Sequence, residues 1–320
     1  MVREFIFMTT LSREFGGTKM TAQTTLRQPI TCGGTGVHSG RDVTLTLRPA
    51  SANRGVVFRR VDITDRDNIV AARWDKVADT QMCTVLRNAA GVRVSTVEHL
   101  MAALAGCGVD NVLVDVDGEE LPIMDGSAQE FVDIISRAGI KNLTAPRRIL
   151  HIDREVSVRE KDKFISIVPH DMLSISCSVH FKESARASGQ RVVDLVNGNF
   201  RELVASARTF GFRRDVETLR ARGLALGGSL HNAVVLEGEE VLNPEGLRFD
   251  DEPVRHKILD CVGDLFLAGG HVRGYVRSER GGHEMNNRLL KAIFADPKNW
   301  HWGGQPPPHP TSHATAAAAI

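Results

Sequence analysis

The sequence has no apolar run close to the roughly 20 residues that a membrane-spanning helix needs. Its apolar patch at Phe5–Met8 is also shorter than the core of a signal peptide, which has at least about 7 residues. Five cysteines are present, an odd number without a C-x-x-C pair, which argues against a disulfide framework and for a reducing compartment. We therefore expect a cytoplasmic protein that does not insert stably into a membrane.

The sequence also has no excess of either charge. The formal net charge is +1, and lysine and arginine are scattered, so no basic face marks the chain as a nucleic-acid binder. The 320 residues, 42% hydrophobic and 25% charged, are enough for a substantial core and for two domains. We expect a globular monomer with no nucleic-acid partner.

Residues 254–268 have the pattern of one helix around which the rest of the chain is organised. Their apolar positions recur at helical spacing, Pro253 falls in the first turn, and Gly269 and Gly270 follow the last apolar position. Asp250 is the expected N-cap. The pattern therefore predicts a helix that begins near 251 and ends before Gly269.

This helix carries polar residues on one narrow face. His256, Asp260 and Asp264 follow one another at four-residue spacing. An imidazole and a carboxylate four residues apart can bind one metal ion, as the histidines of H-E-x-x-H do. H-x-x-x-D alone is more often a solvated pair, so a metal site needs another ligand from elsewhere in the chain.

A second polar pair begins the helix that is expected from about Thr96. Ser95 and Glu98 fit the capping box S-x-x-E, so one interpretation gives Glu98 a purely structural role. The other interpretation makes His99 the missing metal ligand, with Glu98 close enough to act as general base on a metal-bound water. Two histidines and one aspartate would leave one zinc position open for that water.

Three further residues have two interpretations each. Lys257 follows a candidate ligand and could neutralise a developing charge, although a surface lysine is the commoner case. Asp264 could orient and charge a histidine, and His283, in a polar turn before a helix, is the candidate.

The glycine-rich turn at residues 32–40 has some features of a nucleotide-binding loop. Ser39 stands where a third glycine would be needed after Gly34 and Gly36, and G-K-[ST] is absent. A glycine-permissive turn beside a functional groove is the favoured interpretation.

The order of predicted elements repeats along the chain. A helix–strand–helix unit at about 95–138 is followed by another at about 253–294. Strands are expected between 26 and 58 in the first half and between 149 and 180 in the second, where a helix capped by Asn199 follows. This repetition predicts an α+β protein of two similar halves packed face to face.

The composition divides the chain into four parts. We expect a disordered N-terminal extension without a role in the fold at 1–19, a first α+β domain at 20–145 and a second at 146–296. A Pro/Ala-rich tail, disordered or loosely docked, is expected at 297–320. Residues 141–148 have the pattern of a linker. Residues 209–236, with a short helix at Asp215–Arg222, interrupt the second domain, and their apolar residues could be core or could wall an apolar tube.

Four motifs in this order resemble one known family, the UDP-3-O-acyl-N-acetylglucosamine deacetylases. They are Ser95–Leu104, Leu121–Ala128, Ala207–Phe212 and Val254–Asp260, and the resemblance runs from about Leu26 to Ala295. It implies zinc-dependent hydrolysis of the N-acetyl group, the committed step of lipid A synthesis in Gram-negative bacteria. It also implies two α/β layers with the helices inside, plus a βαβ insertion in the second half.

The resemblance assigns a role to each candidate residue. It implies a metal, zinc or alternatively Fe²⁺ in the cell, bound by His99, His256 and Asp260. It implies Glu98 as general base, His283 as general acid, Asp264 as the partner of His283, Thr209 as hydrogen-bond donor to the oxyanion and Lys257 as contact to substrate or acetate.

The resemblance also implies where the substrate lies. The 3-O-acyl chain is expected in an apolar passage lined by Phe210, Phe212, Val216, Ala225, Ser229 and Ala233, with Val37 at its mouth. Phe181 and Arg280 fall near the expected UDP site, where lysine is commoner than the arginine found here. The turn around His283 departs from the family. Gly281 stands where serine is common, and Glu284 stands where a small residue is usual.

Two alternatives stay open at this point. One is a related zinc deacetylase of another acylated amino sugar. The other is a non-catalytic protein that binds a nucleotide sugar or an acyl chain. The presence of Glu98 and His283 beside the three candidate ligands argues against the second, since a binding protein needs neither a base nor an acid.

Overall fold

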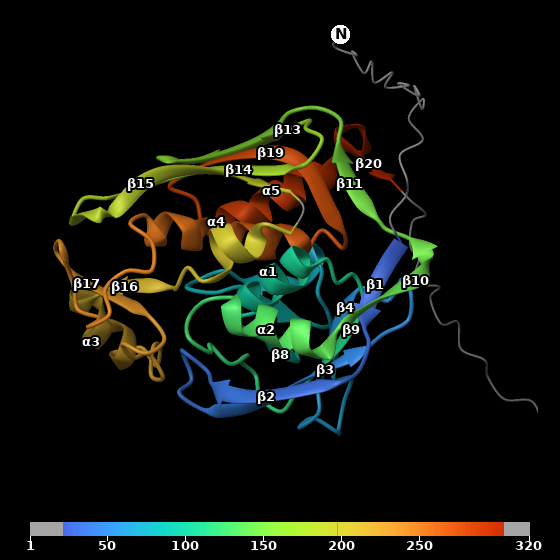
Figure 1. Cartoon of the computed structure of the whole chain (residues 1–320), viewed down its shortest axis with the longest axis horizontal. Helices are drawn as coiled ribbons and strands as arrows, with labels where there is room; N and C mark the ends of the chain where they lie inside the picture. The colour runs from blue at the N-terminus through green and yellow to red at the C-terminus, as the bar shows by residue number, and fades with distance from the viewer. Residues whose placement is uncertain (1–21, 197, 304–320) are drawn as a thin grey trace, which may run out of the picture.

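The computed structural model describes residues 22–196 and 198–303. Figure 1 shows helices in the middle of the molecule, between a sheet from the first half of the chain and a sheet from the second half. The predicted extension at 1–19 lies outside the described residues. The α+β sandwich with helices inside is confirmed.

The first half contains a five-stranded sheet with two helices on its inner face, and its strand order is β2-β3-β9-β4-β5. In β3, Val43, Leu45 and Leu47 are buried while the residues between them face outward, which is the alternation of a half-buried strand. The elements are β1 (Ala22–Leu26), β2 (Ile30–Thr35), β3 (Asp42–Pro49), β4 (Val56–Arg60), β5 (Ile69–Ala71), β6 (Val77–Asp79), β7 (Val85–Arg87), β8 (Arg93–Val94), α1 (Glu98–Cys107), β9 (Val112–Val116), α2 (Gln129–Ala138) and β10 (Ile140–Pro146).

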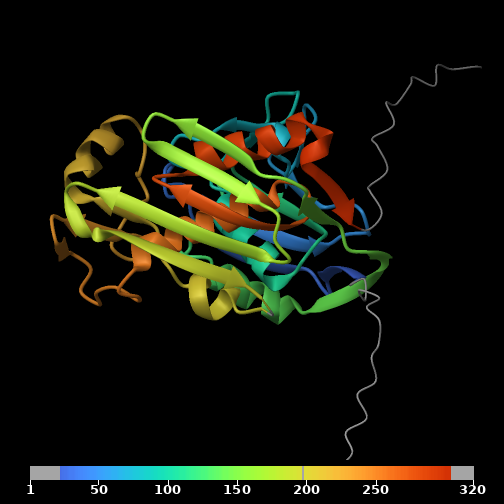
Figure 2. The same ribbon diagram turned by 90° about the horizontal axis from the view of Figure 1, so that it is seen from above.

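The second half contains a seven-stranded sheet, whose strands cross one face of the molecule in Figure 2. The long strand β19 pairs with β11, β13 and β14. The elements are β11 (Ile149–Ile152), β12 (Val156–Glu160), β13 (Lys163–Val168), β14 (Leu173–Phe181), β15 (Ser184–Leu195), β16 (Phe210–Phe212), α3 (Arg213–Ala221), β17 (Val234–Glu237), β18 (Glu240–Val241), α4 (Glu252–Phe266), β19 (His271–Glu279), α5 (His283–Ala295) and β20 (Trp300–Gly303).

The predicted repetition is present. The unit α1-β9-α2 of the first half corresponds to α4-β19-α5 of the second, and α1 packs directly on α4 at the centre of the molecule. The predicted βαβ insertion is also present, since β16 and β17 pair in parallel with α3 between them. It lies at one end of the sandwich (Figure 1).

Two local predictions are wrong because strand pairing overrides local composition. Most of the linker expected at 141–148 belongs to β10, which pairs antiparallel with β1. The tail expected at 297–320 begins with a 3-10 turn and then β20, which pairs with β11, and its residues from 304 on lie outside the described residues. Trp300 of β20 packs edge-on against Phe294 at a centroid distance of 5.0 Å. The prolines and glycines around Trp300 favour a loop, so the local sequence does not indicate this contact.

Two helix starts also differ from the prediction. The helix expected after Asn199 is one π turn, Arg201–Ala205, and the Asn199 side chain binds Asp194 and Val196 rather than the helix. The N-cap of α4 is Asp251 and not Asp250.

The chain passes from the first half to the seven-stranded sheet of the second between β10, which pairs with β1, and β11, close to the predicted domain boundary. Whether the two halves are separate domains stays a prediction. None of the helices in the described part of the chain has the length and hydrophobicity that crossing a membrane requires.

Candidate active site

Three buried side chains meet where α1 packs on α4. His99 comes from the first turn of α1, and His256 and Asp260 lie one turn apart on α4. Their ligand atoms lie within 4.8 Å of one another. Asp260 Oδ1 is 3.3 Å from His256 Nε2 and 3.8 Å from His99 Nε2. The structure therefore brings together the three residues expected to bind a metal.

The chemistry of these three residues fits a bound cation. Asp260 Oδ1 is buried and has no hydrogen-bond partner among the described residues, a costly state for a carboxylate oxygen unless a cation satisfies it. Burial alone would raise the pKa of Asp260, but the facing His256 and Lys257 hold that pKa well below its usual range. The carboxylate is therefore ionised and aimed at both imidazoles.

The two histidines are suited to act as neutral ligands. Burial lowers the pKa of His99 to about 3 and also lowers the pKa of His256. His256 Nδ1 lies 3.0 Å from the carbonyl oxygen of Ala207, so it donates there and leaves Nε2 free to bind a metal. The orientation of His256 in the candidate metal site is thus fixed both by α4, which carries it, and by Ala207, which precedes β16.

Glu98 lies beside this cluster, and the capping-box interpretation of its side chain is wrong. Its Oε2 accepts a hydrogen bond from the backbone N–H of Thr84 at 3.0 Å, and Val97 is the N-cap of α1 without a side-chain bond. Burial raises the pKa of Glu98 to about 7, and the positive charge of His283 opposes that rise. A carboxylate with this pKa is suited to proton transfer near neutral pH.

His283 begins α5 and faces Glu98, with 3.8 Å between His283 Nε2 and Glu98 Oε1. Its Nδ1 lies 2.8 Å from Asp264 Oδ2, as the expected pairing requires. Burial alone would lower the pKa of His283, but Asp264, Glu98 and Asp260 together raise it to about 10. The imidazole is therefore held in its protonated form, which can donate a proton.

Two hydrogen-bond partners of Asp264 were not predicted. Thr84 donates to Asp264 Oδ1 at 2.6 Å, and Asn286 donates to Asp264 Oδ2 at 2.8 Å. Asn286 lies three residues after His283 on the same helix, so its spacing could have indicated it. Thr84 lies in a loop of the first half, where no periodicity points to it.

Lys257 extends from α4 toward the same space. Its Nζ donates to Asp260 Oδ2 at 2.8 Å and lies 5.7 Å from the ring centre of Phe210. Its side chain is 23% exposed and lines a cavity, so the surface-lysine interpretation is wrong. Burial alone would lower the pKa of Lys257, but Asp260 raises it, and the ammonium stays charged.

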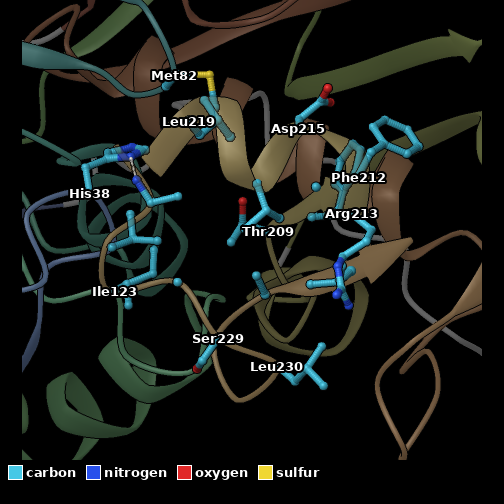
Figure 3. Close-up of a pocket in the computed structure, with 18 of the residues that line it drawn as sticks. His38, Met82, Ile123, Thr209, Phe212, Arg213, Asp215, Leu219, Ser229 and Leu230 are labelled. Atoms are coloured by element: carbon cyan, nitrogen blue, oxygen red, sulfur yellow. Dashed lines mark hydrogen bonds between the residues drawn. The ribbon is translucent and has the colours of Figure 1, made fainter. Parts of the chain in front are cut away.

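This cavity has a volume of about 920 Å³ and begins at Glu98 and His99. Figure 3 shows that His38 and Ile123 of the first half and Leu219, Ser229 and Leu230 of the insertion surround the same space as Thr209. The predicted substrate residues that line it are Val37, Phe181, Phe210, Phe212, Val216, Ala225, Ser229 and Ala233. The cavity therefore connects the polar cluster to the insertion.

Arg280 is the predicted substrate residue that is not in this lining. Its Nη1 donates to Asp162 Oδ2 at 2.6 Å on the surface. The prediction also missed Met82, which lines the cavity from the first half although its side chain is 49% exposed. Met82 has a φ of 70°, a left-handed conformation that no sequence pattern indicated.

The fold and the site together define a class of protein. Two imidazoles and a carboxylate form a buried cluster that could hold a cation. Beside it, a carboxylate of raised pKa and a protonated imidazole face each other at 3.8 Å. These are the groups of a metal-dependent hydrolase that uses a general base and a general acid.

Comparison with known proteins gives the family. The family model described as LpxC, UDP-3-O-acyl N-acetylglycosamine deacetylase, matches residues 23–295. The chain is 47% identical to the UDP-3-O-acyl-N-acetylglucosamine deacetylase of Idiomarina loihiensis, and 46% identical to those of Photobacterium profundum and Vibrio cholerae. Each match covers 88% of this chain and 93% of the relative. The chain belongs to the UDP-3-O-acyl-N-acetylglucosamine deacetylase family, as the motifs predicted.

Proposed function

We propose that this protein hydrolyses the N-acetyl group of UDP-3-O-acyl-N-acetylglucosamine to give UDP-3-O-acyl-glucosamine and acetate, the committed step of lipid A synthesis. The observation that carries the proposal is the position of Glu98 and His283 beside the His99, His256 and Asp260 cluster, at the end of an apolar cavity. A cytoplasmic location and a monomeric state are part of this proposal.

Zinc is the metal we propose, with Fe²⁺ as the alternative in the cell. Two histidines and one carboxylate are a ligand set typical of catalytic zinc, which keeps one position for water or substrate. A bound zinc ion would act as a Lewis acid toward the attacking water and the amide carbonyl.

Glu98 and His283 divide the proton transfers between them. Glu98 takes a proton from the attacking water as the new C–O bond forms at the acetyl carbon. His283 Nε2 then donates its proton to the amide nitrogen as the C–N bond breaks, so that the amine leaves neutral. The 3.8 Å between Glu98 Oε1 and His283 Nε2 lets both groups reach one reacting amide.

Two groups are proposed to neutralise negative charge, one on the carbonyl oxygen during the reaction and one on the released acetate. Thr209 lines the same cavity as Glu98 and His99, and its hydroxyl is the proposed donor to the carbonyl oxygen as that oxygen becomes negatively charged. Lys257 is held by Asp260 and would neutralise the acetate that is released.

The rest of the substrate is proposed to occupy the cavity and its rim. The acyl chain would lie along Phe212, Val216 and Ala233, where the lining is apolar. Phe181 lies against Phe210, with 5.6 Å between the ring centres, at the side where the UDP group would enter. Arg280 would contact the diphosphate only after exchanging its partner Asp162 for a phosphate.

The test is release of acetate from UDP-3-O-acyl-N-acetylglucosamine by the purified protein, before chelation, after chelation, and after zinc or Fe²⁺ is added back. We expect activity that is lost with the metal and returns with it. A substrate without the acyl chain is the control, and we expect much slower turnover. A folded, zinc-loaded protein without activity would overturn the proposal, and equal rates on both substrates would favour another amino sugar.

A further inference from the structure

Thr84 is a buried residue that contacts the carboxylates of both Glu98 and Asp264. It lies directly before β7 and is 1% exposed. Its backbone N–H donates to Glu98 Oε2 at 3.0 Å, and its hydroxyl donates to Asp264 Oδ1 at 2.6 Å. One residue therefore holds the proposed base and the partner of the proposed acid at the same time.

The first contact decides how the Glu98 carboxylate is oriented. A carboxylate on a freely rotating side chain can present either oxygen, but the N–H of Thr84 holds Oε2. The other oxygen, Oε1, is then the one that faces His283 Nε2. The carbonyl of Thr84 accepts the N–H of Val97 at 3.4 Å, so its backbone is itself tied to the start of α1.

The second contact completes the set of donors around Asp264. His283 Nδ1 and Asn286 Nδ2 both lie 2.8 Å from Oδ2, and the hydroxyl of Thr84 binds Oδ1. With donors on both oxygens, the plane of the carboxylate cannot turn without breaking a hydrogen bond. Because His283 donates its Nδ1–H to this carboxylate, the orientation of the His283 ring depends on the orientation of the carboxylate.

The hydrogen bond from the Thr84 hydroxyl to Asp264 crosses from the first half of the molecule to the second. Glu98 belongs to α1 of the first half, whereas Asp264 belongs to α4 of the second. We propose that Thr84 is a positioning residue that sets the general base and the general acid relative to each other across the interface between the halves. The proposal rests on the proposed deacetylase function.

The Thr84→Val variant tests this proposal, because valine keeps the shape and the backbone N–H but removes the hydroxyl. A misplacement of about 1 Å can cost up to about 100-fold in rate. We therefore expect kcat to fall about 10- to 100-fold while KM changes less than about twofold, since Thr84 is not expected to touch the substrate. Thr84→Ser keeps the hydroxyl and should restore most of kcat.

The matched control is Thr25→Val, which removes another buried hydroxyl. Thr25 is 1% exposed. Its hydroxyl donates to the carbonyl of Asn111 at 2.8 Å and accepts the N–H of Ala50 at 2.9 Å, both within the first half. Both variants should lose similar thermal stability, but only Thr84→Val should lose kcat. An equal loss of kcat in the two variants would overturn the proposal, as would a Thr84→Val variant with kcat within twofold of the wild type.

A double-mutant cycle with Asp264→Asn tests whether Thr84 affects kcat through its hydrogen bond to Asp264. If Thr84 acts through Asp264, Thr84→Val should cost far less in the Asp264→Asn background than in the wild type. Additive losses would contradict this route.

A measurement without substrate separates this proposal from the proposed function. The Nδ1–H of His283 should give a proton NMR signal downfield of the amides, which Asp264→Asn removes. We expect Thr84→Val to shift this signal and Thr25→Val to leave it in place. An unshifted signal overturns the role of Thr84 even if the wild type proves inactive on the acylated sugar, whereas that inactivity overturns only the proposed function.

Discussion

Gly263 of α4 lies against the backbone of Glu98 of α1. A Cβ atom added at Gly263 would come within 2.0 Å of the carbonyl oxygen of Glu98 and 3.1 Å of the Ala102 nitrogen. The absence of a side chain at this one position lets the two helices approach closely enough for His99 to share a site with His256.

We expect Gly263→Ala to separate α1 from α4. Alanine favours a helix over glycine by up to about 1 kcal/mol, but forcing a methyl group against the backbone costs about 1–3 kcal/mol. The variant should lose stability, bind zinc more weakly and lose activity, as measured by chemical denaturation and zinc titration. The control is Gly33→Ala in β2, where the added Cβ meets its nearest atom at 3.6 Å. Equal zinc affinity in both variants would show that helix separation does not control the site.

Arg208 and Glu252 form an ion pair that is almost completely buried. The side chains are 1% and 0% exposed, and Arg208 Nε donates to Glu252 Oε1 at 2.8 Å. Arg208→Met leaves the Glu252 carboxylate buried without its partner, which costs about 3–5 kcal/mol. We expect this loss in the free energy of unfolding, measured by denaturant titration. Arg214→Met, which breaks the exposed pair with Glu183, should leave the free energy of unfolding almost unchanged. Similar losses in the two variants would contradict the buried-pair argument.

The pH dependence of kcat/KM should be bell-shaped. Glu98 acts as a carboxylate, so activity rises as the pH passes its pKa, which burial raises to about 7. His283 acts as a cation, so activity falls as the pH passes its pKa, which the surrounding carboxylates raise to about 10 against the effect of burial. A bound metal cation favours the deprotonated form of both groups, so both limbs should lie at or below these values. Glu98 and His283 lie 3.8 Å apart, so the charge of each affects the pKa of the other. The two apparent pKa values of the pH profile therefore describe the pair and not either residue alone.

Two variants assign the limbs in the same assay. Glu98→Gln should keep the metal and lose about 10²–10⁴-fold in kcat, with no acidic limb. Asp264→Asn removes the negative charge beside His283, so the alkaline limb should move to lower pH. A limb that stays in place in Asp264→Asn would show that His283 does not produce it.

Ala233 offers a way to shorten the proposed acyl passage. It lines the cavity at the start of β17, on the opposite side of the strand from the buried Val234. Phenylalanine at this position should shorten the preferred chain, and each methylene excluded should cost about 0.8 kcal/mol, or about fourfold in kcat/KM. The measurement is a series of acyl-chain lengths. Val192→Phe, on the exposed part of β15, should leave the preference unchanged, and unchanged preference in Ala233→Phe would remove Ala233 from the passage.

Local periodicity was enough to predict much of the fold and part of the site. The four-residue spacing of His256, Asp260 and Asp264 places them on one face of any helix, whatever packs against it. The repeated helix–strand–helix order predicted the two halves for the same reason. The local contexts of His99 and His283 made them candidates, and the family resemblance then gave them their roles as metal ligand and general acid, since no spacing connects residues on separate helices.

Only the tertiary structure decided which groups meet across the halves. Thr84 contacts Glu98 and Asp264, which are 14 and 180 residues away in the chain, and Arg280 pairs with Asp162 instead of lining the cavity. Pairing also made a strand of residues 140–146, which have a weak local pattern. Local periodicity determines which face of an element a residue occupies, whereas hydrogen bonds between elements depend on the distance that packing leaves between them.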